Sequence, residues 1–219
     1  MRYVVAATGA SGAPYLRRVV EALLAGGCRV DLIISPAGRV VLADELGWRA
    51  DGDGFAPEEV DERSGWHRPR RLLGGYQAGF WGYRGRGELY LYDVRDVSSD
   101  VASGSTRVDG MVVVPCSMST VAALAVGQSG NLIERAADVA LKEGRRLVIV
   151  PRETPLHAIH LRNLLTLAEA GVRVVPAMPA FYHRPRTLEE IVDFVAARAL
   201  AALGAPVDLV RPWTGLPDA

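Results

Sequence analysis

The chain opens with Tyr3-Val4-Val5-Ala6-Ala7-Thr8-Gly9-Ala10-Ser11-Gly12, an apolar run that passes directly into a turn of small residues. A helical spacing of apolar residues follows, at Leu16, Val19, Val20, Leu23 and Leu24. This order predicts a strand, a tight turn and a helix. Such a turn points unpaired backbone N–H groups and the positive end of a helix dipole at one place. The opening therefore predicts a phosphate site within the first dozen residues.

The same alternation of strands and helices continues along the chain. Apolar runs predict strands near 2–7, 29–34, 110–115, 146–150 and 172–176. Helical patterns lie near 13–25, 37–47, 117–126, 131–142, 157–170 and 187–203. Nearly continuous Val, Ile and Leu runs are typical of strands buried on both faces. We therefore predict an α/β fold, a parallel sheet with helices on both sides.

Small or polar turns follow four of the predicted strands. They are Gly9-Ala10-Ser11, Ser35-Pro36-Ala37, Ser117-Met118-Ser119-Thr120 and Arg152-Glu153-Thr154. Ligands of parallel sheets bind outside the carboxyl ends of the strands, where these turns must meet. The sequence therefore predicts a binding cleft at this edge, rich in hydroxyl groups and closed by a charged turn.

Composition excludes several classes of function. Among 219 residues, 25 basic side chains balance 25 acidic ones. A neutral chain without a long basic run is not expected to bind nucleic acid or an anionic membrane surface. No apolar run reaches the length of a membrane span, and the first run is too short for a signal peptide. Two isolated cysteines, Cys28 and Cys116, are typical of reduced thiols in a cytoplasmic protein.

Residues 48–92 interrupt the alternation. This stretch is rich in Gly, contains Pro57 and Pro69, and holds nine aromatic residues: Trp48, Phe55, Trp66, Tyr76, Phe80, Trp81, Tyr83, Tyr90 and Tyr92. We expect a partly ordered insertion with a hairpin around 80–92, packed on the domain or on a neighbouring subunit. An irregular tail is expected from Pro206. Residues 1–219 are otherwise predicted to form a single domain.

Three familiar kinds of site are disfavoured by the residues present. A dinucleotide fingerprint would need glycine where Tyr15 stands and an acidic residue where Ser35 stands. A hydrolase elbow around Ser11 would need glycine where Ala13 stands. His157 and His160 share a helix face, but two histidines without a third ligand are more often packing or capping residues. We therefore predict no metal site.

Charged residues point to a second anionic group beside the phosphate. Arg135 and Lys142 lie seven residues apart, on one face of a predicted helix. Lys142 is the only lysine, so 24 of the 25 basic residues are arginine, and its position invites a chemical explanation. Arg152 follows a strand, and Tyr182 and Arg198 lie on either side of the start of the last helix region. Several cations beside hydroxyl-rich turns are typical of a cleft that binds a phosphorylated cofactor and a phosphorylated substrate.

Six blocks of the chain, taken in order, resemble the UbiX-type flavin prenyltransferases. They are Gly9-Ala10-Ser11-Gly12-Ala13, Pro115-Cys116-Ser117-Met118-Ser119-Thr120, Asn131-Leu132-Ile133-Glu134-Arg135-Ala136-Ala137-Asp138-Val139, Leu141-Lys142-Glu143, Arg152-Glu153-Thr154-Pro155-Leu156-His157 and Pro179-Ala180-Phe181-Tyr182-His183-Arg184-Pro185. The resemblance implies a three-layer, Rossmann-like or flavodoxin-like domain assembled as a homododecamer, with active sites at subunit junctions. It also implies a metal-independent enzyme that joins a dimethylallyl group from dimethylallyl phosphate to N5 and C6 of reduced FMN. The prenylated FMN would pass to a UbiD-type decarboxylase.

The resemblance also assigns residues by matching position. FMN would contact Gly9, Ala10, Ser11, Ser35, Ser117, Met118, Ser119, Thr120 and Arg152. The prenyl phosphate would contact Arg135, Lys142, Glu153, Tyr182 and Arg198. Ser11, Glu45, Lys142 and Glu153 would serve the reaction, with Glu45 near the reacting edge of the flavin. Cations that face a leaving phosphate stabilise the transition state, and Glu153 would share a proton with that phosphate.

Two other functions remain open from the residues. One is an FMN-binding protein without turnover, and the other is a flavin-dependent decarboxylase of the phosphopantothenoylcysteine type. The joint presence of Lys142, Arg152, Glu153, Tyr182 and Arg198 favours the prenyltransferase over both.

Overall fold

The computed structural model describes residues 1–47, 70–71 and 86–210. All the strands in these ranges belong to one seven-stranded sheet. The strands are β1 (Arg2–Ala7), β2 (Arg29–Ile34), β3 (Arg70–Arg71), β4 (Glu88–Tyr92), β5 (Gly110–Cys116), β6 (Arg146–Pro151) and β7 (Arg173–Val174). Their order across the sheet is β3-β4-β2-β1-β5-β6-β7. Every pairing is parallel except that of β3 with β4.

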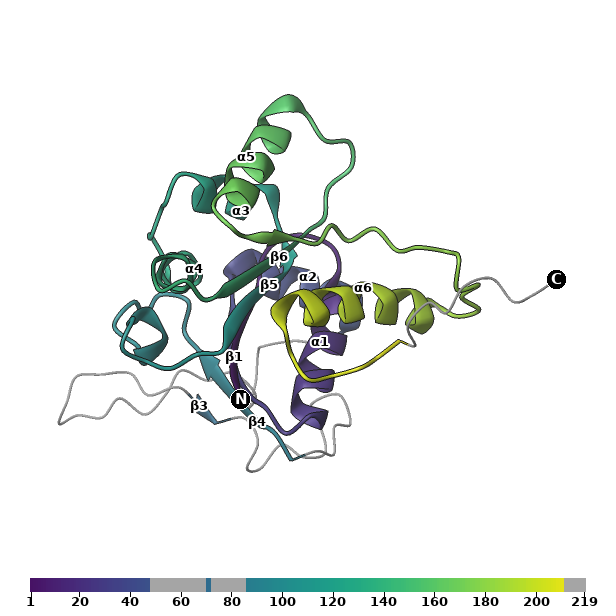
Figure 1. The fold of residues 1–219 in the computed structure, drawn as a ribbon, viewed down its shortest axis with the longest axis horizontal. Helices are drawn as coiled ribbons and strands as arrows, with labels where there is room; N and C mark the ends of the chain where they lie inside the picture. Colours follow the sequence, from purple (N-terminus) through teal and green to yellow (C-terminus); the bar gives the residue numbers. More distant parts are fainter. Residues whose placement is uncertain (48–69, 72–85, 211–219) are drawn as a thin grey trace.

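The six parallel strands follow the Rossmann order. Without β3, the order across the sheet is third, second, first, fourth, fifth and sixth strand. Successive strands are added on one side of β1 as far as β4 and on its other side from β5 onward, and Val5 of β1 lies opposite both Leu32 of β2 and Val112 of β5. This switch point is where doubly wound sheets place their ligands. It brings the turns after β1 and β5 side by side (Figure 1).

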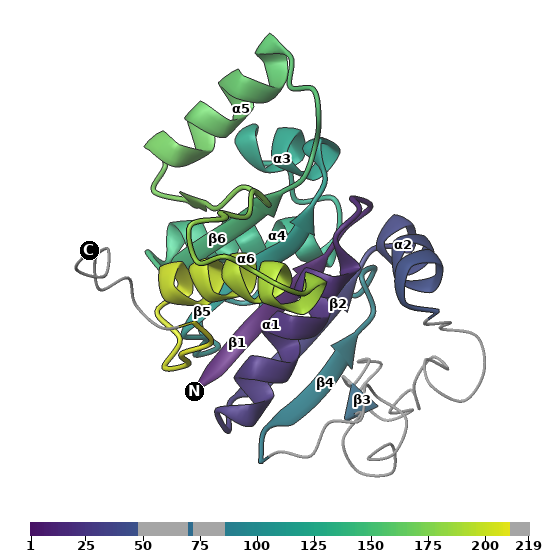
Figure 2. The same cartoon turned by 90° about the vertical axis from the view of Figure 1, so that its right-hand side faces the viewer.

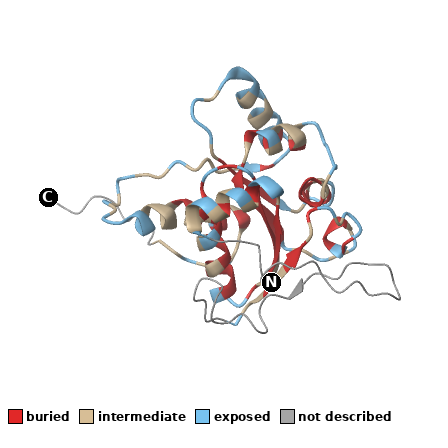
Figure 3. Ribbon diagram, turned by 180° about the vertical axis from the view of Figure 1, so that it is seen from behind, coloured by how far each residue is buried: buried red, intermediate tan, exposed pale blue. Residues whose placement is uncertain are grey.

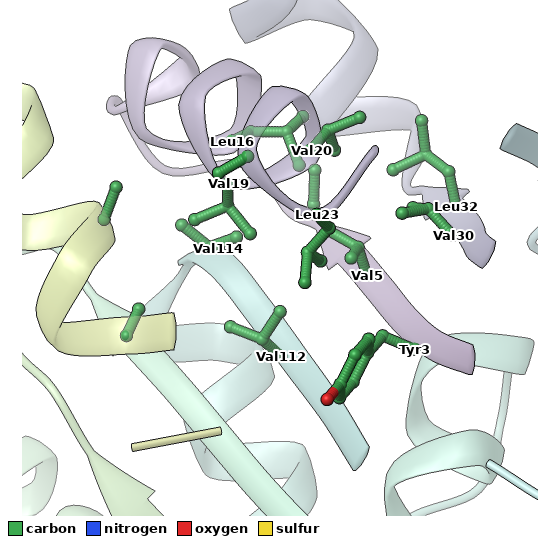
Figure 4. Packing of buried hydrophobic residues seen from close by; sticks show 14 of the residues in the cluster. Tyr3, Val5, Leu16, Val19, Val20, Leu23, Val30, Leu32, Val112 and Val114 are labelled. Atoms are coloured by element: carbon green, nitrogen blue, oxygen red, sulfur yellow. The ribbon is translucent and has the colours of Figure 1, made fainter. Parts of the chain in front are cut away.

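Helices cover both faces of the sheet (Figure 2). They are α1 (Ala13–Ala25), α2 (Pro36–Leu46), α3 (Met118–Ala125), α4 (Leu132–Lys142), α5 (Ala158–Glu169) and α6 (Leu188–Leu203), with a 3₁₀ turn, η1, at Asp100–Ala102. Successive residues of β1 face opposite cores, since Tyr3 and Val5 pack with α1 and α6 (Figure 4), whereas Val4 and Ala6 pack with α4 and η1. The uninterrupted apolar run of β1 follows from burial on both sides.

Helices α3 and α5 pack together beyond the carboxyl ends of the strands (Figure 1). Leu167 is the only fully buried residue of α5. Ile159, Leu161 and Leu165 of this helix are 61%, 53% and 58% exposed. In Figure 3, α5 is coloured mostly as exposed or intermediate. Helix α5 therefore presents apolar side chains to its surroundings.

A charged network joins three strands at the amino edge of the sheet. The Asp31 carboxylate is fully buried and accepts hydrogen bonds from Arg2 Nε at 2.5 Å and Arg29 Nε at 2.9 Å. Arg2 Nη2 also donates to Asp100 at 2.7 Å, and the Tyr92 hydroxyl donates to the same carboxylate at 2.9 Å. These hydrogen bonds link strands β1, β2 and β4 to one another and to the turn η1.

The predicted elements are found, with one correction. All five predicted strands and all six predicted helices occur, mostly within a residue or two of their predicted ends. Residues 88–92 are wrong as part of an insertion, because β4 pairs in parallel with β2 and buries Leu89 and Tyr92. Strand β4 also pairs antiparallel with residues 70–71, and the part of the predicted hairpin at 80–85 lies outside the described residues.

Other predictions lie outside the described residues. Most of the aromatic segment falls within 48–69 and 72–85, and the tail is described only as far as Val210. The single-domain prediction for residues 1–219 therefore stays a prediction. No helix within the described ranges is both long and apolar enough to cross a membrane.

Candidate active site

A buried threonine fixes the two turns at the switch point. The Thr8 backbone N–H and its Oγ1 both donate to the Pro115 carbonyl at 3.1 Å. The same Oγ1 accepts from the Ser117 backbone N–H at 2.8 Å. Thr8 is only 3% exposed, so these bonds lie in the protein interior, where they are strong. The turn after β1 and the start of α3 are thereby held in one geometry.

Glycine at position 9 allows the first turn to approach α2. A Cβ built on Gly9 would lie 2.5 Å from the Ala37 Cβ, and one on Gly38 would lie 2.8 Å from the Ala7 carbonyl oxygen. Ser35 caps α2 by accepting from the Gly38 N–H at 3.0 Å. The turn after β1 and the start of α2 thus pack closely against each other.

We expect Gly9→Ala to displace the first turn and to reduce FMN binding at least tenfold, because the added methyl would overlap Ala37. Overpacking of this kind destabilises a protein by about 1–3 kcal/mol. Gly144→Ala is the matched control, since a Cβ there meets open space at a φ of +64°. That control carries a backbone strain of about 1–2 kcal/mol, which should leave FMN binding intact. Equal FMN titrations for the two variants would contradict the role given to Gly9.

The start of α1 is closed by a carboxylate of the same chain. Glu45, on α2, accepts from the Gly12 N–H at 2.9 Å and from the Ala13 N–H at 2.7 Å. Gly12 has a φ of +129°, which residues other than glycine rarely adopt. The next residue but one, Pro14, has no backbone N–H that could bind an anion. The prediction of a phosphate at the start of α1 is therefore wrong for these amides, because Glu45 already occupies them.

The start of α3 offers the free anion site instead. Ser117 is the N-cap, and its Oγ accepts from the Thr120 N–H at 3.3 Å and lies 3.1 Å from the Thr120 hydroxyl. The first amides of a helix have no partner within it, and Ser117 serves only the third. The Met118 and Ser119 amides, flanked by two hydroxyl groups, are thus placed where a helix start can accept one phosphate. One such site suits a mononucleotide such as FMN.

A cavity of about 790 Å³ adjoins the first turn and the start of α6. Its lining residues include Ser11, Gly12, Tyr15, Glu45 and Arg152. Arg152 Nε donates to the Ser11 carbonyl at 3.2 Å, so the end of β6 is joined to the turn after β1. Burial and the nearby Glu45 carboxylate raise the pKa of Tyr15, which therefore stays a neutral phenol.

The structure brings all nine predicted flavin residues to one edge of the sheet. Gly9, Ala10, Ser11, Ser35, Ser117, Met118, Ser119, Thr120 and Arg152 all follow the carboxyl ends of β1, β2, β5 and β6 or begin the next helix. Glu45 joins this group through Gly12 and Ala13. Thr8, Tyr15 and Gly38 were missed by the sequence analysis. Of these, Gly38 had a local signal, a glycine in the first turn of a helix.

Within one chain, Lys142 does not reach this edge, and Arg135, near the start of α4, has its partners on η1 and on α4 itself. Arg135 donates to the Ala102 carbonyl at 3.2 Å and to Asp138 at 2.9 Å. Lys142 ends α4, is exposed, and donates to Glu143 at 2.6 Å. The whole length of β6, roughly 20 Å at the usual rise of a strand, separates the end of α4 from Arg152. A cleft containing both Lys142 and Arg152 therefore needs a second copy of the chain.

The remaining predicted substrate residues lie on exposed surface. Glu153 accepts from the Thr154 N–H at 3.0 Å. Tyr182 is 58% exposed and meets the Phe194 ring edge-on, at 5.9 Å between centroids. Arg198 lies one turn beyond Phe194 on α6 and lines a second cavity with it. Tyr182 and Arg198 therefore belong to one side of α6.

The histidine pair caps a helix. His157 is the N-cap of α5, its Nδ1 accepts from the His160 N–H at 3.4 Å, and the two rings stack with centroids 3.4 Å apart. Within residues 1–47 and 86–210, no group of three or more His, Cys, Asp or Glu is placed to hold a metal.

Comparisons with known proteins agree with this fold and site. Residues 1–200 match the Flavoprotein family. A flavin prenyltransferase UbiX from Synechocystis sp. is 46% identical over 216 residues, which covers 97% of this chain and 95% of the relative. A dodecameric FMN-dependent UbiX-like decarboxylase from Escherichia coli O157:H7 has a TM-score of 0.77 at 36% identity, over 99% of this chain and 100% of that chain. AnUbiX (PadA1), solved with FMN and dimethylallyl pyrophosphate, has a TM-score of 0.78 at 34% identity, over 99% and 98%.

The chain therefore belongs to the Flavoprotein family. Within that family it is a member of the UbiX-type flavin prenyltransferases.

Proposed function

We propose that this protein is a flavin prenyltransferase that joins a dimethylallyl group from dimethylallyl phosphate to N5 and C6 of reduced FMN. The observation that carries the proposal is a site for one phosphate at the start of α3, beside a cavity lined by Ser11, Glu45 and Arg152. The reaction is inferred from family membership, since the relatives include a flavin prenyltransferase and a structure solved with FMN and dimethylallyl pyrophosphate.

The residues at the carboxyl edge fit FMN. The Met118 and Ser119 amides and the hydroxyls of Ser117 and Thr120 would hold its phosphate, while the close approach at Gly9 leaves backbone exposed to the ligand. Bound FMN supplies the nucleophilic ring positions. Ser11, Glu45 and Arg152 would face the ring, where Arg152 adds a positive charge and Glu45 an acceptor for a proton.

A neighbouring copy would complete the substrate side. Arg135 and Lys142 of one subunit would stabilise the charge that grows on the leaving phosphate at a site of another, together with Glu153, Tyr182 and Arg198. The exposed Ile159, Leu161 and Leu165 of α5 support an assembly that buries this surface, and a dodecameric relative supplies the arrangement. We propose a homododecamer that passes prenylated FMN to a UbiD-type decarboxylase. The free cysteines Cys28 and Cys116 support a cytoplasmic location.

Anaerobic incubation with reduced FMN and dimethylallyl phosphate is expected to yield a flavin heavier by one isoprene unit. Mass spectrometry of the released flavin measures this product, and oxidised FMN serves as the control that stays unmodified. Retention of unmodified FMN with reduced flavin and donor present would instead identify an FMN-binding protein without this activity. Loss of carbon dioxide from a cysteine-derived substrate would identify the decarboxylase alternative.

A further inference from the structure

A short loop lies against both of the α4 cations that the proposed function assigns to the leaving phosphate. Residues 100–105, called the α4 loop below, consist of η1 and the three residues after it. Val101 and Ala102 are buried in the same hydrophobic core as Ala136 and Ala140 of α4. The first half of the loop is therefore packed against the helix.

The first half of the α4 loop holds Arg135. The Arg135 Nε donates to the Ala102 carbonyl at 3.2 Å, and Nη1 donates to Asp138 of the same helix at 2.9 Å. An arginine side chain has many rotamers, and each hydrogen bond of this kind restricts them. The direction of the guanidinium group is thus set in part by the backbone of the loop.

The second half of the α4 loop lies against Lys142 at the end of the helix. A Cβ built on Gly104 would lie 2.8 Å from Lys142 Nζ and would overlap the Glu143 carboxylate, which accepts from Lys142 at 2.6 Å. The Gly104 carbonyl accepts from Arg145 Nη2 at 2.5 Å. The missing side chain of Gly104 therefore leaves the space in which the ammonium group lies, and Arg145 holds the loop beside it.

A carboxylate at the start of the α4 loop joins it to the sheet. Asp100 accepts from Arg2 Nη2 at 2.7 Å and from the Tyr92 hydroxyl at 2.9 Å. Arg2 is itself paired with the fully buried Asp31 at 2.5 Å. The loop that contacts the two cations is therefore fixed to β1 and β4.

We propose that the α4 loop positions Arg135 and Lys142 for the leaving phosphate, with Asp100 and Gly104 as its positioning residues. Asp100 acts through Arg135, and Gly104 acts through Lys142. Cations stabilise a leaving group best when they are held in place beforehand, and a misplacement of about 1 Å can lower a rate about a hundredfold. The inference rests on the proposed function, which places the two cations at the phosphate.

Double-mutant kinetics test the proposal, with the rate of prenylated FMN formation as the measurement. Gly104→Ala is expected to lower kcat/KM for dimethylallyl phosphate about tenfold in the native protein and less than about twofold in Lys142→Ala, because its effect passes through Lys142. Asp100→Ala should behave in the same way towards Arg135→Ala. Asp100→Asn keeps an acceptor oxygen for Arg2 and should recover most of the rate. FMN titrations should give the native affinity for each variant.

Gly130→Ala is the matched control for Gly104→Ala. Neither glycine has a positive φ, and the atoms nearest to a Cβ on Gly130 are the ends of the Glu134 and Gln128 side chains, at 3.2 and 3.3 Å. The control should prenylate FMN as fast as the unmodified protein. Equal losses of kcat/KM with and without Lys142 would identify Gly104 as a structural residue and overturn the proposal. Equal rates for Gly104→Ala and Gly130→Ala would overturn it as well.

Reductive methylation with isotope-labelled formaldehyde gives a second measurement that needs no activity. Lys142 is the only lysine, so it and the amino terminus are the amines that react, and dimethylated lysine keeps its charge. In the proton–carbon NMR spectrum, Gly104→Ala should move the Lys142 signal and leave that of the amino terminus in place, whereas Gly130→Ala should move neither. An unmoved Lys142 signal would refute positioning by Gly104. Absence of prenylated FMN from the unmodified protein would instead refute the proposed function and leave the NMR result standing.

Discussion

Co-assembly of two weakly active variants, Lys142→Ala and Glu45→Gln, is expected to restore prenylation of FMN. Alone, each variant should retain FMN and prenylate it roughly tenfold to a thousandfold more slowly, the usual effect of losing electrostatic or proton-transfer assistance. Glu45 lies at the carboxyl edge of the sheet with Gly12, whereas Lys142 ends α4 at the amino edge. One site therefore draws the two residues from different subunits.

The expected recovery can be calculated. In a randomly mixed assembly, each site takes its Glu45 from one subunit and its Lys142 from another. About a quarter of the sites then contain both native residues, and the mixture should show about a quarter of full activity. Co-expression with two different affinity tags and purification through both provides the mixed assemblies, and the rate of prenylated FMN formation is the measurement.

Lys142→Ala mixed with Arg135→Ala is the matched control. Both residues lie on α4, so every α4 in this mixture carries one of the two substitutions. A site that takes both residues from one α4 therefore always lacks one of them. This mixture should stay as slow as its parents. Failure of the Lys142→Ala and Glu45→Gln mixture to exceed its parents would show that one chain supplies both residues, contrary to the placement in the structure.

Local patterns were sufficient to predict most of the fold. Strand β1 is a continuous apolar run because both of its faces are buried, and Ser35, Ser117 and Thr187 begin helices as N-caps. Strand β4 was missed because Glu88-Leu89-Tyr90-Leu91-Tyr92 alternates like a hairpin strand. The parallel pairing of β4 with β2 depends on residues far away in the sequence. One of them is Arg29, whose guanidinium lies 4.1 Å from the centre of the Tyr90 ring.

The site was predictable where its residues follow strands and not where distant residues act on them. The hydroxyl-rich turn at Ser117 has a local signature and lies where we expected it. The occupation of the Gly12 and Ala13 amides depends on Glu45, more than thirty residues along the chain, so the opening turn alone could not reveal it. The separation of Lys142 from Arg152 depends on the direction of β6, which spacing along a helix does not encode.

Asp31→Ala is expected to cause the largest loss of stability among substitutions outside the site. The Asp31 carboxylate is fully buried between Arg2 and Arg29, so its removal leaves two partly buried guanidinium groups without their shared partner. Removing one member of a buried ion pair usually costs about 3–5 kcal/mol. Burial raises the pKa of Asp31 while Arg2 and Arg29 lower it, and the net pKa stays above the ordinary value. The two arginines therefore offset only part of the desolvation of the Asp31 carboxylate.

The measurement is thermal unfolding of the unmodified protein, Asp31→Ala and Arg95→Ala at one protein concentration. For a chain of this length, 1 kcal/mol shifts the midpoint by about 2–4 °C, so Asp31→Ala should melt at least about 6 °C lower. Arg95→Ala breaks an ion pair whose arginine side chain is 83% exposed, and such pairs contribute at most about 1 kcal/mol. Equal midpoints for the two variants would contradict the prediction. They would mean that Asp100, which also binds Arg2, and the Tyr90 ring, which lies under Arg29, neutralise and cover both arginines once Asp31 is gone.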